Sequence, residues 1–233
     1  MFTLPKKRMG FVEILKAIFV CWKSQVLPLL PLSFLSVLLT TLPGFGLRFG
    51  YIQPFHVGFY LITALSYALY LIPSGGIIAF ISNNLHGTPI NSVNALKIGV
   101  SRFIKMLLTG IVLLAIMYLL VRIGLLISHG YPRATLIITS LLVLLVSPFL
   151  LPASPLVIID NKWPHEAIVG GIRMVKGSWL QTFVVLVIVS FITLFLNFLA
   201  SRMGPVVVFI VSLFMLPLTL SMTVTVTENL KLK

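Results

Sequence analysis

Acidic and imidazole side chains, which could transfer protons or bind a metal ion, cluster at one place along this sequence. Asp160, His165 and Glu166 lie close together there, but their spacing is not that of a metal-binding motif such as His-x-x-x-His. Acids are also favoured in the first turn of a helix, where they interact with the helix dipole. We therefore favour a helix start over a reactive site, and we predict no catalytic residue, no metal and no cofactor.

A second group of residues could shape a cavity or hinge within a membrane. Proline removes a backbone hydrogen bond and kinks a helix, and kinked helices often line transporter cavities. Proline is also simply commoner in membrane helices, paired glycines allow close packing, and threonine can bond to the preceding turn. Both interpretations stay open for the candidate cavity or hinge residues, which are Pro73, Gly75, Gly76, Pro148, Pro152, Pro155, Pro217 and Thr223.

The composition indicates whether these residues lie in water or in a lipid bilayer. Of the 233 residues, 59% are hydrophobic and 9% charged, whereas a soluble domain carries roughly 25% charged residues. The apolar residues form continuous runs rather than an alternating pattern, which favours helices over a membrane barrel. We expect an all-α integral membrane protein, a single domain over 1–233, with six spans at 25–42, 56–82, 104–126, 134–159, 180–200 and 205–226.

The basic residues predict how the chain crosses the membrane. With the N-terminus inside, only Arg48, Arg122, Arg133 and Arg202 of the 17 basic residues fall outside. Cytoplasmic loops carry an excess of lysine and arginine, so both termini are predicted to be cytoplasmic. The net charge of +13 is scattered between apolar runs, which argues against nucleic-acid binding and favours contact with anionic lipid head groups.

Three segments on the predicted cytoplasmic side read as amphipathic helices lying in the membrane interface. The first covers 9–23, and the others precede the third and fifth spans. Trp22, Phe103 and Trp179 would anchor the chain where it turns into the membrane. These anchors recur at about 80 residues, which suggests a threefold internal repeat of an interfacial helix, a span outward and a span back.

This layout resembles the YciC-like family of bacterial inner-membrane proteins. The stretch 154–162 (SPLVIIDNK), the segment ending near Trp179 and the helix expected from Asn91 to Arg102 carry the likeness. The chain is more distantly similar to the membrane domain fused to some glycerophosphoryl diester phosphodiesterases. The resemblance implies a six-helix protein of the bacterial inner membrane and supplies no catalytic residue.

Three function classes follow from these observations. The leading hypothesis is a non-enzymatic protein that supports membrane or envelope organisation through contacts with lipids or a membrane protein partner. The alternative is a transporter or flippase-like carrier of a lipid-like or small apolar substrate, with a proline-rich central cavity. A membrane-embedded enzyme comes third, because no acid, base and nucleophile converge in the sequence.

Overall fold

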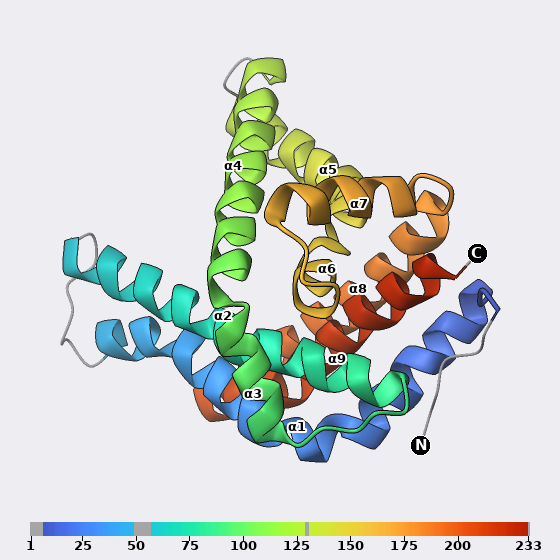
Figure 1. Ribbon diagram of the computed structural model, residues 1–233. Coiled ribbons are helices and arrows are strands. Elements are labelled where there is room, and N and C mark those ends of the chain that lie inside the picture. Colours follow the sequence, from blue (N-terminus) through green and yellow to red (C-terminus); the bar gives the residue numbers. More distant parts are fainter. Residues whose placement is uncertain (1–6, 49–56, 129–130, 233) are drawn as a thin grey trace.

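The computed structural model describes residues 7–48, 57–128 and 131–232, and within these ranges the chain is helical with no strand. Figure 1 shows the helices, which are α1 (Phe11–Arg48), α2 (Val57–Leu85), α3 (Ser92–Ser101), α4 (Phe103–Ile127), α5 (Pro132–Leu150), α6 (Ala153–Ile159), α7 (Pro164–Val175), α8 (Trp179–Met203) and α9 (Pro205–Lys231).

Six helical segments among the described residues are long and apolar enough to cross a membrane. They are Phe11–Gly44, Val57–Leu85, Phe103–Ile127, Pro132–Ile159, Trp179–Met203 and Pro205–Lys231. A helix needs about 20 apolar residues to span the hydrocarbon core, and each segment exceeds that length. The prediction of an all-helical chain with six potential spans is therefore confirmed.

Two predicted boundaries differ from the structure. The interfacial helix expected at 9–23 and the span expected at 25–42 form one continuous helix, α1. Neither glycine nor proline occurs between Phe11 and Val26, so nothing interrupts the backbone hydrogen bonds there. The span expected at 134–159 consists instead of α5 and α6, separated by a turn at Leu151 and Pro152, because Pro152 lacks the N–H that would continue α5.

The buried centre of the molecule is built from the second halves of the returning helices. Residues 73–85 of α2, helix α6 and residues 215–229 of α9 contact one another and contain most of the fully buried side chains. Ile77 and Ile81 of α2, Leu156 of α6 and Val224 of α9 belong to one apolar cluster. We call this centre the hub, and it lies where the three helices converge.

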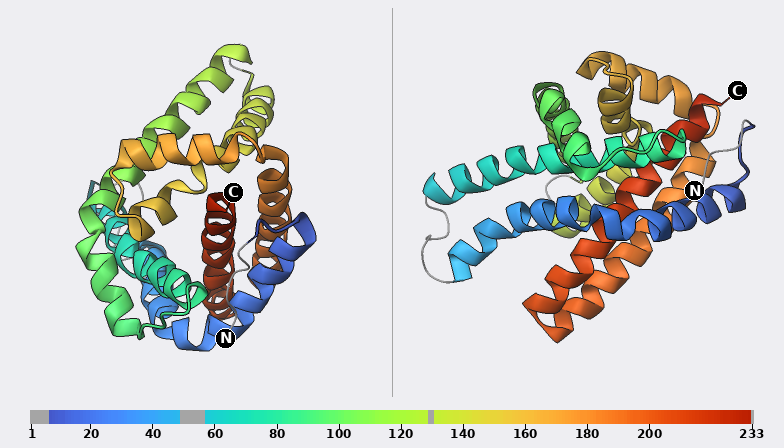
Figure 2. Two further views of the ribbon diagram at one scale, coloured as in Figure 1. Left: turned by 45° about the vertical axis from the view of Figure 1, so that its right-hand side comes forward. Right: turned by 60° about the horizontal axis from the view of Figure 1, so that its bottom comes forward.

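Three helix pairs extend from the hub in different directions. These pairs are α1–α2, α4–α5 and α8–α9, and Figure 2 shows that their far ends, here called the tips, diverge. Gly204 alone joins α8 to α9, with a φ of 114° that a side chain would strain. The α4–α5 pair packs little of its surface against the rest of the chain, since only 6% of the residues in the most apolar stretch of each span are buried. Long apolar flanks therefore face outward between the pairs.

Candidate functional site

A cluster of charged side chains joins the ends of the three returning helices at the hub. Lys231 Nζ, on the last turn of α9, lies 2.7 Å from Asp160 Oδ1 and 2.9 Å from Glu228 Oε1. The other oxygen of Glu228 lies 3.3 Å from Nε2 of His86, which follows α2. Asp160 stands at the end of α6 and also lies 3.7 Å from Lys162 Nζ. One lysine thus connects acids from two helices, and one of those acids contacts the end of the third.

Burial decides which members of this cluster matter most for the fold. The Glu228 side chain is 6% exposed, whereas Lys231 and Asp160 are 26% and 28% exposed. A buried carboxylate is costly unless it is paired and hydrogen-bonded. The arrangement pairs each acid with a basic partner and joins the ends of three helices, so we call it the charged clamp.

The acid and histidine cluster predicted from the sequence does not come together as a pocket. Glu166 Oε2 accepts a hydrogen bond from Trp163 N at 3.0 Å at the start of α7, while His165 is exposed. Glu13 does the same at the start of α1, where Gly10 N donates to its Oε2 at 2.7 Å. Both acids lie in the first turn of a helix, as we favoured for Glu166, whereas Asp160 of the same predicted cluster lies at the end of α6 and not at a helix start. No group of three or more His, Cys, Asp or Glu side chains that could hold a metal occurs in the described ranges.

The predicted cavity or hinge residues pack inside the hub or beside it. Buried among them are Pro73, Gly75, Gly76, Pro148, Pro152, Pro155 and Pro217. Thr223 is half-buried, and its hydroxyl donates to Leu220 O in its own helix at 2.9 Å. None of these residues lines the grooves described below.

Two short helices make close backbone contacts beside buried prolines of α2 and α5. A Cβ on Gly99 of α3 would overlap Ile72 O, next to Pro73. A Cβ on Gly171 of α7 would lie 3.1 Å from Phe149 O, next to Pro148. The short helices α3 and α7 therefore sit directly on the proline-containing turns of α2 and α5.

Two of the three predicted anchors contact proline-containing helices as well. Trp22 Nε1 donates to Phe214 O at 2.9 Å, and Trp179 Nε1 donates to Leu145 O at 3.2 Å. Each acceptor lies three residues before a buried proline, Pro217 or Pro148. A kink tilts nearby carbonyls away from the helix axis, where they can accept from a side chain. Phe103, the third anchor, is the first residue of α4.

The spaces between helix pairs are the openings of this structure. An apolar groove of about 570 Å³ separates α2 from α4, and its lining includes Ala64, Ala68, Leu107, Ile111 and Leu114. A second groove, of about 340 Å³, lies where α1 and α2 meet α8 and α9. A third lies within the α4–α5 pair, next to Thr139 and Leu125. These volumes overlap the range of ligand pockets, roughly 300–1,000 Å³.

Two basic side chains, Arg102 and Lys105, lie at the start of α4, before the part of that helix that lines the α2–α4 groove, and neither is among the lining residues. Lys105 Nζ donates to the main-chain and side-chain oxygens of Asn161 at 2.8 and 2.6 Å, and it lies 5.0 Å from the centre of the Trp163 ring. Arg102, one turn earlier, has a buried Nε with no hydrogen-bond partner. The ion pairs among the described residues involve neither cation. A negatively charged group could therefore approach Arg102 and Lys105 without displacing an acid.

The charged clamp and the pair of cations at the start of α4 were not predicted as candidate sites. His86, Asp160 and Glu228 lie far apart in the sequence, and only the packing of three helices brings their ends together. One signal could have found the clamp: each returning span ends in a short polar stretch containing Asn83, Asn161 or Asn229. Threefold packing of such ends places their charges side by side.

The architecture defines a class, an all-helical protein with six potential membrane-spanning helices arranged as three divergent pairs. No protein-family description, curated protein or solved structure matches this chain.

Proposed function

We propose that this protein is a non-enzymatic, multi-pass protein of a bacterial inner membrane that organises lipids, and that the α2–α4 groove holds one anionic phospholipid. The observation that supports the proposal is that two cations lie at the start of the helix that lines one side of an apolar groove. Leu107, Ile111 and Leu114 line the groove on α4, and Lys105 and Arg102 precede them on the same helix. An acyl chain would lie in the groove while the phosphate contacts the two cations.

The orientation in the membrane is part of the same proposal. Both termini and the hub face the cytoplasm, and the starts of α1, α3 and α7 lie in the inner interface. Exposed Lys97 and Lys176 on the hub side support this orientation, whereas exposed Arg133 near the tip of α5 is one of the few basic residues on the other side. Anionic lipids of the cytoplasmic leaflet attract basic segments at about 1 kcal/mol per residue.

The threefold repeat and the YciC-like layout also stay proposals, supported by packing. The bond from Trp22 to α9 and the bond from Trp179 to α5 use the same position relative to a buried proline. Such agreement is expected if corresponding units pack in corresponding ways. A central carrier path finds less support, because Pro73, Pro152 and Pro217 are buried in helix contacts.

Lipid analysis of the native particle tests the anionic-lipid proposal. The full chain is extracted directly into polymer-bounded nanodiscs without detergent, and the retained lipids are quantified by mass spectrometry. Wild-type particles should hold an excess of anionic phospholipid over empty discs from the same membrane. The variant Arg102→Gln/Lys105→Gln should lose the excess, while Lys97→Gln/Lys176→Gln, with the same change in charge, should keep it.

A second pair of variants separates groove occupancy from charge and from misfolding. A Cβ on Gly110 or on Gly44 meets no atom within 4 Å, and Gly110 lines the groove whereas Gly44 does not. Gly110→Leu should displace the lipid and Gly44→Leu should not. Retained lipid identical in composition to the bulk membrane, or an excess unaffected by Gly110→Leu, contradicts the proposal.

A further inference from the structure

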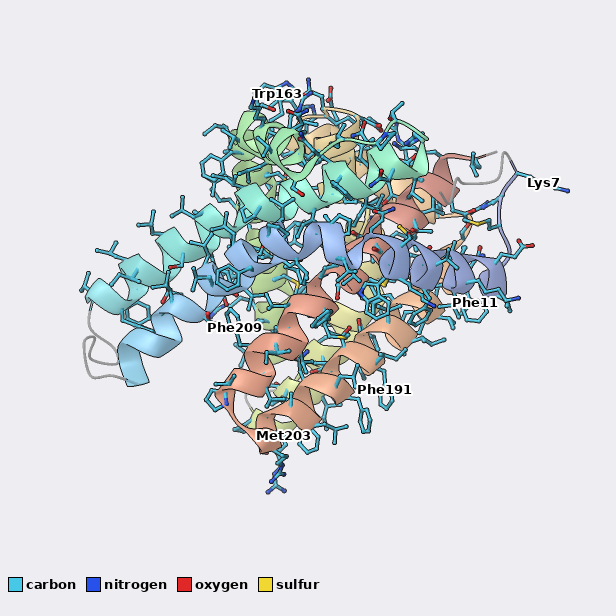
Figure 3. The ribbon with its side chains drawn as sticks, turned by 90° about the horizontal axis from the view of Figure 1, so that it is seen from below. Lys7, Phe11, Trp163, Phe191, Met203 and Phe209 are labelled. Carbon is cyan, nitrogen blue, oxygen red and sulfur yellow. The ribbon has the colours of Figure 1, made fainter. Side chains whose placement is uncertain are left out.

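The groove between the α1–α2 pair and the α8–α9 pair has a polar lining although it lies among apolar helices. It lies among helices that can span a membrane, yet hydroxyl and amide side chains from three of them face it. These side chains are Thr40, Thr41, Thr193, Asn197, Ser212 and Thr219. Figure 3 shows the two pairs separating near Phe209, whose ring contacts Phe34 of α1 at 5.7 Å between centroids. The groove lies beside this contact, against residues 37–41 of α1 and 212–219 of α9.

Threonine hydroxyls in this lining already donate their hydrogen atoms to main-chain oxygens of their own helices. Thr41 donates to Val37 O at 2.8 Å, Thr193 donates to Val189 O at 2.9 Å, and Thr219 donates to Met215 O at 3.1 Å. A hydroxyl carries one donor hydrogen and two acceptor lone pairs. Each of these threonines consequently offers only acceptors to the groove.

Asn197 and Ser212 also donate hydrogen bonds to neighbouring protein oxygens. Ser212 Oγ donates to Asn197 Oδ1 at 3.2 Å, and Asn197 Nδ2 donates to Thr193 O at 2.8 Å. The first bond connects α9 to α8, the second lies within α8, and together they fix the orientation of the amide. The oxygen of Ser212 keeps its lone pairs free to accept. One side of the groove is therefore rich in hydrogen-bond acceptors.

The opposite wall carries phenols. Tyr67 and Tyr70 of α2 line the groove, and each can donate as well as accept. No charged residue lines it. An anionic phosphate would meet mostly acceptor oxygens without a cation, and a bare ammonium is costly at this depth. The chemistry that fits is a neutral hydroxyl, which donates to the threonine oxygens and accepts from a tyrosine.

We infer that this groove binds a neutral membrane lipid whose head is a free hydroxyl group, of the diacylglycerol type. The hydroxyl lies among Thr193, Ser212 and Thr219, and the acyl chains leave the groove along the apolar flanks of α1 and α8. This inference goes beyond the proposed function: it concerns a different groove and a neutral rather than an anionic lipid. The two grooves have Tyr67 and Tyr70 of α2 in common, and both proposals rest on the premise that these helices lie in a bilayer.

Photocrosslinking of the full chain in phosphatidylcholine nanodiscs tests the inference. The probe is a diacylglycerol carrying a diazirine in one acyl chain, and crosslinked peptides are mapped by mass spectrometry. Crosslinks are expected on α1, α8 and α9 beside the groove. Unlabelled dioleoylglycerol should compete, whereas dioleoylphosphatidic acid, with the same acyl chains and a phosphate in place of the hydroxyl, should not.

Matched variants identify the oxygens responsible. Thr193→Val/Thr219→Val removes two acceptors while keeping side-chain shape, and should reduce crosslinking at least about threefold. Thr63→Val is the control, because Thr63 also donates within its own helix, to Phe59 O at 2.7 Å, but lies outside the groove. Leu216→Trp, which narrows the groove without removing an oxygen, should also reduce crosslinking.

Two results would overturn the inference. The first is equal competition by the phosphatidic acid, and the second is unchanged crosslinking in the double valine variant. Loss of crosslinking in Thr63→Val as well would show that the effect is not specific to the groove, which also counts against it. The retained anionic phospholipid is measured separately, so the two proposals can fail independently.

Discussion

At the scale of single residues, the contact between α2 and α3 depends on the absence of a side chain. A Cβ at Gly99 would overlap Ile72 O and would come within 2.9 Å of Gly76 N. Both neighbours are backbone atoms, so relief requires one helix to move away from the other. Overpacking of this kind typically costs about 1–3 kcal/mol.

Gly99→Ala is therefore expected to lower the thermal unfolding midpoint of the purified protein in nanodiscs. Gly44→Ala is the matched control, since its Cβ meets no atom within 4 Å. Alanine in a helix is favoured over glycine by about 0.5–1 kcal/mol, so the control should be as stable as the wild type or slightly more. A Gly99→Ala protein as stable as Gly44→Ala would refute the packing described for α3.

The charged clamp makes a second prediction at this scale. Lys231→Met leaves the buried Glu228 without its closest cation, so stability should fall by about 1–3 kcal/mol; a fully buried pair would lose more. Adding Glu228→Gln removes the unpaired charge. The double variant Glu228→Gln/Lys231→Met should then unfold at a higher temperature than Lys231→Met alone. If the effects of the two substitutions on stability are additive, Glu228 and Lys231 are not coupled in the way that their 2.9 Å distance indicates.

At the scale of helices, the two indole hydrogen bonds connect α1 and the start of α8 to proline-containing helices. Trp22→Phe and Trp179→Phe each remove a donor to a main-chain oxygen and keep an aromatic ring. Each variant should lose about 0.5–1.5 kcal/mol of stability. Trp163→Phe is the control, because that ring lies beneath the Lys105 amine rather than donating to a neighbouring helix. Thermal unfolding should rank Trp163→Phe nearest the wild type, and the reverse order would contradict the role assigned to the indole bonds.

The helices also show which structural features could be predicted from the sequence and which could not. Apolar runs long enough to span a membrane stand out because the bilayer requires continuous apolar helices, and all six were predicted near their observed positions. The boundary expected before Gln25 was wrong, because Lys23 and Ser24 are polar but do not break a helix. These polar residues suggested that a helix ends here, but α1 continues through them. The Gln25 side chain is buried and donates to Cys21 Sγ in the same helix.

The candidate sites were harder to predict than the spans. The burial of Pro73 and Pro217 follows from which helices meet, and neither periodicity nor composition encodes that choice. The clamp of His86, Asp160 and Glu228 has the same origin. Helix existence is a local property of the chain, whereas convergence of helix ends is a property of the assembled fold.

At the scale of the whole molecule, the separation of hub and tips gives a direct test of orientation. Lys97 and Lys176 are exposed at the hub, and Arg133 is exposed near a tip. Single cysteines at Lys97 or Lys176 should react with a membrane-impermeant maleimide only after the cytoplasmic face is opened. Arg133→Cys should react in intact spheroplasts.

The native thiol supplies an internal control for that experiment. Cys21 is fully buried, so it should stay unlabelled in both preparations until the protein is denatured. Labelling of Arg133→Cys only after opening the cytoplasmic face, with the hub cysteines reactive beforehand, would invert the proposed topology.

The bond between Met9 N and Asn229 Oδ1, at 2.8 Å, joins the two ends of the helical array. Helix α9 is synthesised after the other eight described helices, and it supplies one third of the hub together with Lys231. During translation, the face of α1 around Ile18 therefore stays uncovered until α9 has been made, because Met215, Leu218 and Met222 of α9 belong to the same apolar cluster. Contacts between distant segments form late and slowly. A chain that ends before α9 would lack Asn229 and Lys231, so their contacts with Met9 and Asp160 could not form.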